Sequence, residues 1–241
     1  MEGHSWKAAV ASTDSVSAAA PGPAATPREK ASGPRSRKGA ATRTRLLLAA
    51  KAVFEEDGFL DARISDIAER AGLSHGSFYH YFDSKEQIFR EVARTVSDLL
   101  QQPLYDTVFN QAAAAHPSAR LRLVARRFLE IYRDEARIIG VIEMASRLDP
   151  ELTGIRADYW EPDRLRAARL VSRMQLEGSA DPSLNPEIAI SAMSAMMNRF
   201  AEMWFVQKLF EFDFDDGVEQ LIRLCLNALH MEDPNRGSAV G

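Results

Sequence analysis

The chain has 241 residues, of which 46% are hydrophobic, a formal net charge of −4 and one cysteine, Cys225. This length and apolar content suffice for a small domain and a larger one with its own core. A lone cysteine excludes an intramolecular disulfide, which suits a reducing compartment. No apolar run approaches the ~18 residues of a membrane helix, and the N-terminus lacks the leucine-rich core of a secretion signal. We therefore expect a cytoplasmic protein without a membrane partner.

The two ends of the chain, residues 1–39 and 232–241, are expected to be disordered. Residues 1–39 consist mainly of Ala, Ser, Pro and Gly, which cannot bury enough surface to offset the entropy of ordering the chain. The first helix is predicted from Thr42 to about Asp57, because apolar residues share one side and Gly58 follows as a stop. Those apolar residues are Leu46, Leu47, Ala50, Val53 and Phe54.

The stretch Ile64–Phe82 carries the most specific pattern in the chain. Its first half, from Ile64 to Ala71, repeats apolar residues at the spacing of one helix face. Gly72 can take the left-handed conformation that ends a helix and turns the chain, and Ser74 is a suitable N-cap for a second helix. That second helix contains a glycine and four aromatic residues, which are mediocre helix formers. Helix propensity alone therefore does not explain its composition.

A helix that reads DNA accounts for this composition. Gly76 would let the backbone approach the duplex, while Phe78 and Phe82, four residues apart, would hold the opposite face to the domain. A further helix begins near Ser84, and Lys85 would meet a phosphate at its N-terminus. The alternative is an aromatic-rich helical hairpin buried in a core. The residues predicted to contact DNA are Arg43, Thr44, Arg63, Ser74, His75, Gly76, Ser77, Tyr79, His80 and Lys85.

From about Thr42 to Val96 the chain resembles the N-terminal domain of tetracycline-repressor-type (TetR family) bacterial transcriptional regulators. The family's phrase FxExGF stands here at Phe54–Phe59, and IAxxAGVSxGxxYxYFxSKExL stands at Ile67–Phe82 and Ser84–Ile88. The resemblance implies an all-helical homodimer with a three-helix, helix-turn-helix head and a variable helical body that binds a small molecule. It also implies ligand-induced release from an operator. The corresponding ranges are 40–90 for the head and 91–231 for the body.

Two positions depart from the family pattern. Position 75 commonly carries lysine, whereas His75 offers an imidazole, so one contact becomes weaker or pH-sensitive. Arg63 stands where Thr or Ser frequently caps the helix, and a cation at a helix N-terminus opposes the helix dipole. Arg63 is therefore either reaching for DNA or a solvated residue at a frayed helix start.

The net charge divides unevenly along the chain. Residues 1–94 carry 14 Lys and Arg against 12 Asp and Glu, a balance of +2, whereas residues 95–241 carry 16 against 22, a balance of −6. The basic residues between Arg28 and Lys51 face only Glu29, a distribution typical of phosphate contact. The basic end of the tail would then lie along DNA as a flexible arm. A solvated tail without a role is the alternative.

The rest of the chain is predicted to be helical, with no alternating strand-like segment, so the predicted fold class is all-α. A helix is predicted from Glu86 to about Leu100, bent or ended by Pro103. The resemblance to TetR-like proteins implies that this helix links head to body. Further helices are predicted over 117–133, 135–148, 150–177 with a kink or restart at Pro162, 186–210 and 215–229.

The helix predicted over 186–210 is apolar on two sides. One covering would be its own domain, and the other a partner subunit that, with the helix 215–229, forms a four-helix homodimer interface. Two-fold pairing would also double the DNA site. A central core helix in a monomer is the alternative. One face carries Ile188, Ala192, Ala195, Met196, Met203 and Phe210, and the other carries Ile190, Met193, Met197, Phe200 and Trp204.

An adaptable apolar cavity in the body is the predicted effector site, because methionine repacks around irregular guests. Such residues at helical spacing also form ordinary core, which is the alternative. Arg199 interrupts an apolar helix and would pair with Glu143 or Glu202, either to orient a ligand or to lock the dimer. The predicted lining residues are Met144, Tyr159, Trp160, Met193, Met197 and Phe200.

The sequence therefore predicts a transcriptional repressor that binds a palindromic double-stranded DNA operator as a dimer. A small apolar or amphipathic effector would release it. The alternative is a DNA-binding regulator or architectural protein without an effector. Catalysis is not expected, since the sequence has no nucleophile elbow, Gly-rich phosphate loop, HExxH or paired-cysteine metal motif. No cofactor and no metal are implied.

Overall fold

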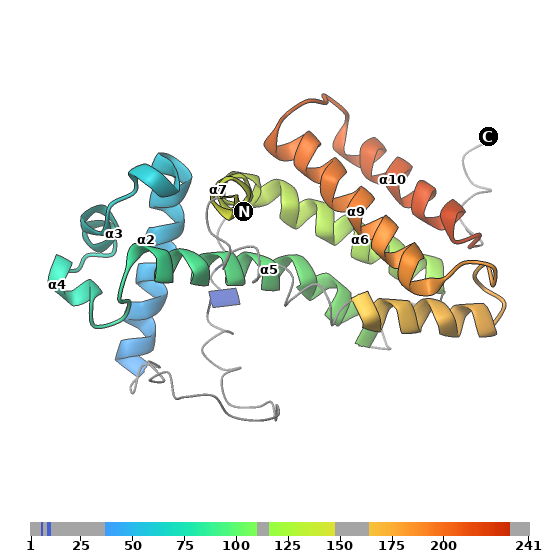
Figure 1. The fold of residues 1–241 in the computed structure, drawn as a ribbon, viewed down its shortest axis with the longest axis horizontal. Coiled ribbons are helices and arrows are strands. Elements are labelled where there is room, and N and C mark those ends of the chain that lie inside the picture. The colour runs from blue at the N-terminus through green and yellow to red at the C-terminus, as the bar shows by residue number, and fades with distance from the viewer. Residues whose placement is uncertain (1–5, 7–8, 11–36, 110–115, 148–163, 232–241) are drawn as a thin grey trace. The chain divides into compact units, whose positions relative to one another are not determined.

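A computed structural model describes residues 6, 9–10, 37–109, 116–147 and 164–231 of the chain (Figure 1). All regular elements within these residues are helices, which confirms the predicted all-α fold class. None of the described helices combines the length and hydropathy that crossing a membrane requires. The chain forms two compact units, the first comprising Met1–Leu99 with Arg137–Ile155 and the second Leu100–Ala136 with Arg156–Gly241.

The first unit is built around α2. This helix begins before the predicted Thr42, and Gly58, with a φ of 74°, interrupts it at the predicted place. The chain then brings Phe59 back toward the core, where its ring centroid lies 4.6 Å from that of Phe89, while Phe54 meets Phe89 edge-on at 4.8 Å. The elements are α2 (Arg37–Asp61), α3 (Ile64–Arg70), α4 (His75–Phe78), the first part of α5 (Lys85–Phe109) and α7 (Ala136–Ser146).

Two residues near the N-terminus also belong to the core of the first unit. Trp6 and Val10 are helical and only 4% and 1% exposed, and the Lys51 ammonium lies 5.4 Å from the centroid of the Trp6 ring. The expectation that residues 1–39 are disordered throughout is therefore wrong at these positions. A large aromatic and a branched aliphatic residue four positions apart share one helix face, and together they bury apolar surface that the overall composition of the tail conceals.

The second unit consists of helices whose ends are set by local capping. Pro117 and Pro186 occupy first-turn positions of α6 and α9, where a missing N–H costs nothing. The Asn185 side chain accepts hydrogen bonds from the first turn of α9, and the Asp213 side chain caps α10. The elements are α6 (Pro117–Asp134), a helix over 164–176, α9 (Pro186–Ala201), η1 (Glu202–Val206) and α10 (Phe214–Ala228).

Two predicted helix boundaries differ from the structure. α5 continues through Pro103 to Phe109, so the predicted end of this helix at about Leu100 is wrong. The helix predicted over 186–210 ends at Ala201 and continues as one π-helical turn to Val206. A π-turn inserts one residue into the helical ladder, which places aromatic side chains together at this end of α9. These are Phe200, Trp204, Phe205, Phe210, Phe212 and Phe214.

A polar cluster ties the end of α10 to the loop before α9. The Asp181 carboxylate accepts hydrogen bonds from the backbone N–H and the hydroxyl of Ser183, at 2.8 and 2.6 Å, and lies 2.9 Å from the His230 ring. The backbone N–H of Asp181 donates to the Leu229 carbonyl at 2.9 Å. These hydrogen bonds, those from Ser183 first, lower the pKa of Asp181 from 3.8 to about 2.

Replacing Asp181 with Asn should lower the thermal stability of the protein at neutral pH. Because the folded-state pKa lies below the ordinary value, the carboxylate stabilises the fold above about pH 4, and this contribution is lost as the pH falls toward 2. Circular dichroism melts should show a constant Tm difference between wild type and Asp181→Asn from pH 7 to 5. The difference should then narrow below pH 4, and a difference that does not change with pH would contradict this assignment.

Candidate nucleic-acid interface and effector cavity

The loop between α3 and α4 forms the tight turn that the sequence predicts. Gly72 adopts a φ of 66°, and the backbone N–H of Leu73 donates to the Ala68 carbonyl at 2.9 Å, which satisfies a carbonyl at the end of α3. Ser74 then caps α4, because its Oγ accepts a hydrogen bond from the Ser77 backbone N–H at 3.2 Å. The two short helices therefore form a helix-turn-helix.

The inward face of α4 is fixed by two phenylalanines. Phe78 and Phe82 are 0% and 1% exposed, and their ring centroids lie 5.7 Å apart. The regular helix is shorter than predicted, since it ends at Phe78, but the Phe82 backbone N–H still donates to the Phe78 carbonyl at 3.1 Å. The helical turn therefore continues far enough to place both rings in the core, as the spacing predicts.

The outward face of α4 carries the side chains that the sequence predicts to contact DNA. Tyr79 is 48% exposed, and its ring meets that of His75 at a centroid distance of 5.3 Å. Ser77 is half-buried. This surface is polar and aromatic, and the residues exposed on it are Ser74, His75, Gly76, Tyr79 and His80.

Gly76 has no structural requirement for glycine within the described chain. Its backbone is not left-handed, and a Cβ added there would meet no atom within 4 Å. Glycine nonetheless costs a helix about 1 kcal/mol relative to alanine. The missing side chain leaves room for a close approach from outside the protein, which a helix that lies against a duplex would need.

Arg43 is held inside the first unit. Its guanidinium pairs with Glu91, lies 5.2 Å from the centroid of the Phe82 ring, and is only 14% exposed. The prediction that Arg43 contacts DNA is therefore corrected: this cation connects α2 to α5 and covers one of the two anchors of α4. Nothing local in the sequence indicates an ion pair across 48 positions. Thr44, beside it on α2, is partly exposed.

Lys85 is also engaged by the protein. Its ammonium donates to the carbonyls of Leu60 and Ala62, both at 3.0 Å, and lies 4.9 Å from the centroid of the Phe59 ring. An ammonium has three N–H donors, so one is left for a phosphate. Lys85 therefore stabilises the end of α2 first, a role that sequence reasoning missed, and it remains a candidate for a phosphate contact.

Other exposed cations make no side-chain hydrogen bond or ion pair to the described parts of the chain, among them Lys38, Arg45 and Arg63. Arg63 was predicted as a contact residue, and the other two lie in the basic region of α2. By contrast, Arg70 pairs with Glu56 at 2.7 Å, and this hydrogen bond lowers the pKa of Glu56.

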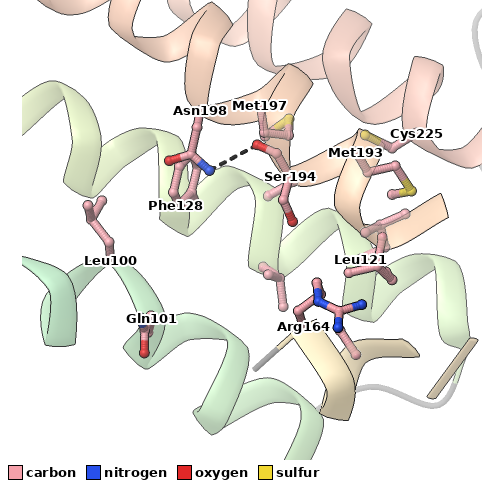
Figure 2. Close-up of a pocket in the computed structure, with 14 residues that line it drawn as sticks. Leu100, Gln101, Leu121, Phe128, Arg164, Met193, Ser194, Met197, Asn198 and Cys225 are labelled. Carbon is pink, nitrogen blue, oxygen red and sulfur yellow. Dashed lines mark hydrogen bonds between the residues drawn. The ribbon is translucent and has the colours of Figure 1, made fainter. Parts of the chain in front are cut away.

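A cavity of about 220 Å³ lies in the second unit, between the last part of α5, α6, the helix 164–176, α9 and α10. Two of the predicted effector-site residues, Met193 and Met197, line it, and Figure 2 shows both extending from α9. Cys225 also lines it, and burial raises the pKa of its thiol to about 11, which keeps the thiol protonated. Residues that were not assigned to the site include Leu121, Val124, Phe128 and Arg164.

The other predicted effector-site residues do not line this cavity. Phe200 stacks on Phe210 at a centroid distance of 5.4 Å. Met144 is 70% exposed on α7, where the adjacent Ala145 and the nearby Ile142 form the buried face, and it is not among the residues that line this cavity. The predictions for Tyr159 and Trp160 lie outside the described residues.

Comparison with known proteins identifies the family. Residues 46–92, which include α3, α4 and the start of α5, match the profile of "Bacterial regulatory proteins, tetR family". The chain is 31% identical over 157 residues to the HTH-type transcriptional repressor KstR2 of Mycolicibacterium smegmatis, a match that covers 63% of this chain and 71% of that protein. The chain belongs to the TetR family.

Other TetR-family proteins resemble it over different lengths. The HTH-type transcriptional regulator RutR of Escherichia coli K12 is 36% identical over 130 residues, which cover 52% of this chain but only 59% of RutR. The fold extends further than the sequence match. The crystal structure of FadR from Bacillus subtilis in complex with stearoyl-CoA aligns with a TM-score of 0.64 at 17% identity, covering 77% of this chain and 98% of that one.

Replacing Gly76 with Ala in this TetR-family head should raise the stability of the protein and lower its affinity for DNA. The methyl group meets no atom within the described chain, and alanine favours helix by about 1 kcal/mol, so the Tm should rise by a few degrees. Affinity for operator DNA, measured by fluorescence anisotropy, should fall at least tenfold. A variant that is more stable and binds DNA as tightly as wild type would show that α4 does not approach the duplex closely at this position.

Proposed function

We propose that the protein is a transcriptional repressor that binds a palindromic operator as a homodimer and is released by a small molecule. One observation carries the proposal: α4 and the turn after it bury Phe78 and Phe82 and expose a polar and aromatic face that contains Gly76, where the fold does not require glycine. Phosphate contacts would come from exposed cations beside that face, among them Arg63 and Arg45. Base edges would be read by side chains of α4 itself.

An exposed apolar face on α9 supports the homodimer. Ile188 is 68% exposed, and Ala192 and Ala195, on the same face, are also exposed. The opposite face packs within the unit, since Met197 and Trp204 are 9% and 6% exposed. A second copy of the chain would cover the first face, together with α10, whose Leu224 is 55% exposed.

Arg199 lies at the end of the exposed face of α9. It pairs with Glu202 at 2.8 Å while remaining 57% exposed, and it does not line the cavity. Of the two roles considered for this pair, the position favours a contribution to the dimer rather than to ligand orientation. An exposed ion pair within one helix stabilises the monomer by only about 0.5 kcal/mol. A larger contribution of this pair to dimer stability would require that the partner subunit bury it.

Release by an effector is supported by the cavity and by the relatives. The cavity is lined by methionine, leucine and phenylalanine side chains with few polar groups, as is typical of sites for small apolar ligands. KstR2 is named a transcriptional repressor, and FadR was solved with stearoyl-CoA. Selection of operators from random DNA with the full-length protein, followed by release assays with apolar compounds, tests the proposal. DNA that is bound but never released by any compound would favour a regulator without an effector.

Replacing Ile188 with Glu should convert the dimer to a monomer, because a carboxylate would then be buried at the proposed interface without a partner. Light scattering should show half the mass, and affinity for a palindromic operator should fall at least a hundredfold. Met144→Glu is the matched control, since Met144 is equally exposed but lies on α7. Retention of the dimer by Ile188→Glu, or its loss in both variants, would argue against this interface.

The basic end of the N-terminal tail is proposed to contact DNA phosphates as an arm. Replacing Arg28, Lys30 and Arg35 with Gln tests this better than truncation, which would also remove the buried Trp6. A plot of log affinity against log salt concentration should lose roughly 0.9 in slope for each phosphate contact removed. An unchanged slope would show that the tail is solvated and plays no part in binding.

A further inference from the structure

A second cavity of about 360 Å³ adjoins the first in the second unit. The two are neighbours because the same side chains line both, and all of these shared side chains are apolar. They come from α6, the helix 164–176 and α9, and they are Leu121, Val124, Ala167, Ile190 and Met193.

The two cavities differ in charge at their far ends. At the end of the first, Phe128 and Met197 lie among uncharged polar side chains, namely Gln101, Ser194 and Asn198 (Figure 2). Its arginine, Arg164, is 13% exposed and paired with Glu187 at 2.9 Å. The described residues that border the second include two arginines, Arg120 and Arg173, and one carboxylate, Glu177. The wall of the second cavity also includes the first residue of α6, where the helix dipole adds partial positive charge. This end therefore favours an anion.

Met193 is the flexible residue of the shared wall. Methionine has three rotatable bonds and adapts its shape to its neighbours, whereas Val124 and Ile190 are β-branched and stiff at the first torsion. A rotamer change at Met193 would join the two spaces without moving a helix. The larger cavity alone is at the lower end of the roughly 300–1,000 Å³ of small-molecule sites, and the two together fall well within that range.

We propose that the effector is an elongated apolar molecule with one anionic group, bound across both cavities. The anionic group lies at Arg120 and Arg173, and the apolar chain passes Met193 and ends between Phe128 and Met197. This inference rests on the proposed effector-binding function and specifies the chemistry of the ligand. Arg173 is exposed and makes no side-chain hydrogen bond or ion pair elsewhere in the described chain, so an anion would be its partner.

Straight-chain saturated carboxylates of 8 to 18 carbons and the primary alcohols of equal length are the probes. Calorimetry with the full-length dimer should show affinity that rises with chain length, and long carboxylates should bind at least tenfold more tightly than the matched alcohols, because a hydrogen bond to a charged group is worth more than a neutral one. Arg173→Gln should remove most of that difference. Arg127→Gln, an exposed arginine of α6 that lines neither cavity, should leave it unchanged.

The position of the apolar chain is tested at the shared wall. Met193→Trp should weaken binding of the long carboxylates at least tenfold and leave the affinity for the eight-carbon carboxylate unchanged. Met193→Ala should bind the long and the eight-carbon carboxylates as tightly as wild type. Ala167→Phe, a second obstruction of the same wall, should reproduce the pattern if Met193→Trp fails to fold. Equal binding of alcohols and carboxylates, or long-chain binding that survives both obstructions, would overturn the inference.

Operator release, measured on the same samples, separates this inference from the proposed function. Release by some other compound while no carboxylate binds would overturn the ligand chemistry and leave effector control standing. Failure of every compound to bind or to release DNA would overturn both.

Discussion

The burial of Phe78 and Phe82 is the interaction on which the DNA-facing surface depends. The two rings are almost completely buried, and each buried phenylalanine contributes roughly 1.5–3 kcal/mol by removal from water. That is more than the cost of a glycine and several aromatic residues in a helix of barely more than one turn. Tertiary packing therefore determines which side of α4 points outward.

Some cations of the head bind other groups of the protein and stabilise this arrangement, whereas others are exposed to solvent. Arg43 covers Phe82 while paired with Glu91, and Lys85 donates to the carbonyls at the end of α2. Arg43 links α2 to α5 beside one anchor of α4, and Lys85 links the start of α5 to the end of α2. The head thus uses part of its positive charge internally, so the count of its basic residues overstates the positive charge offered to DNA.

The head could be predicted from the sequence because its determinants are local. Gly72, Ser74 and the phenylalanine spacing act within a few residues, and the structure shows the turn, the cap and the buried face where they were expected. The partners of Arg43 and Lys85 could not be predicted, since they lie 48 and about 25 positions away. No local sequence pattern indicates that a cation lies near an aromatic ring from a distant part of the chain.

The second unit was harder to predict because core and cavity use the same residue types. Met193 and Met197 line the cavity, whereas Phe200 of the same helix joins an aromatic stack. The difference arises at the π-turn Glu202–Val206, which interrupts the regular helix just after Phe200 and which helical periodicity does not anticipate. Likewise, Met144 has the composition of a lining residue but lies on the exposed side of α7.

The continuity of α5 would provide the connection that the proposed effector control requires. α5 begins at Lys85, directly after the α4 segment, and extends through Pro103 to Phe109, while Leu100 and Gln101 on the same helix line the first cavity. A ligand in that cavity would contact the helix that carries the head. The affinity of the cavity for this ligand would therefore differ between different placements of α5. A ligand shifts a conformational equilibrium only by this difference in affinity, and a change from about 1% to 99% requires roughly 10⁴-fold. A long apolar ligand supplies such a difference more readily than a compact one, because each buried CH₂ contributes about 0.8 kcal/mol. About seven carbons buried in only one placement of α5 would then supply the roughly 5.5 kcal/mol that 10⁴-fold represents.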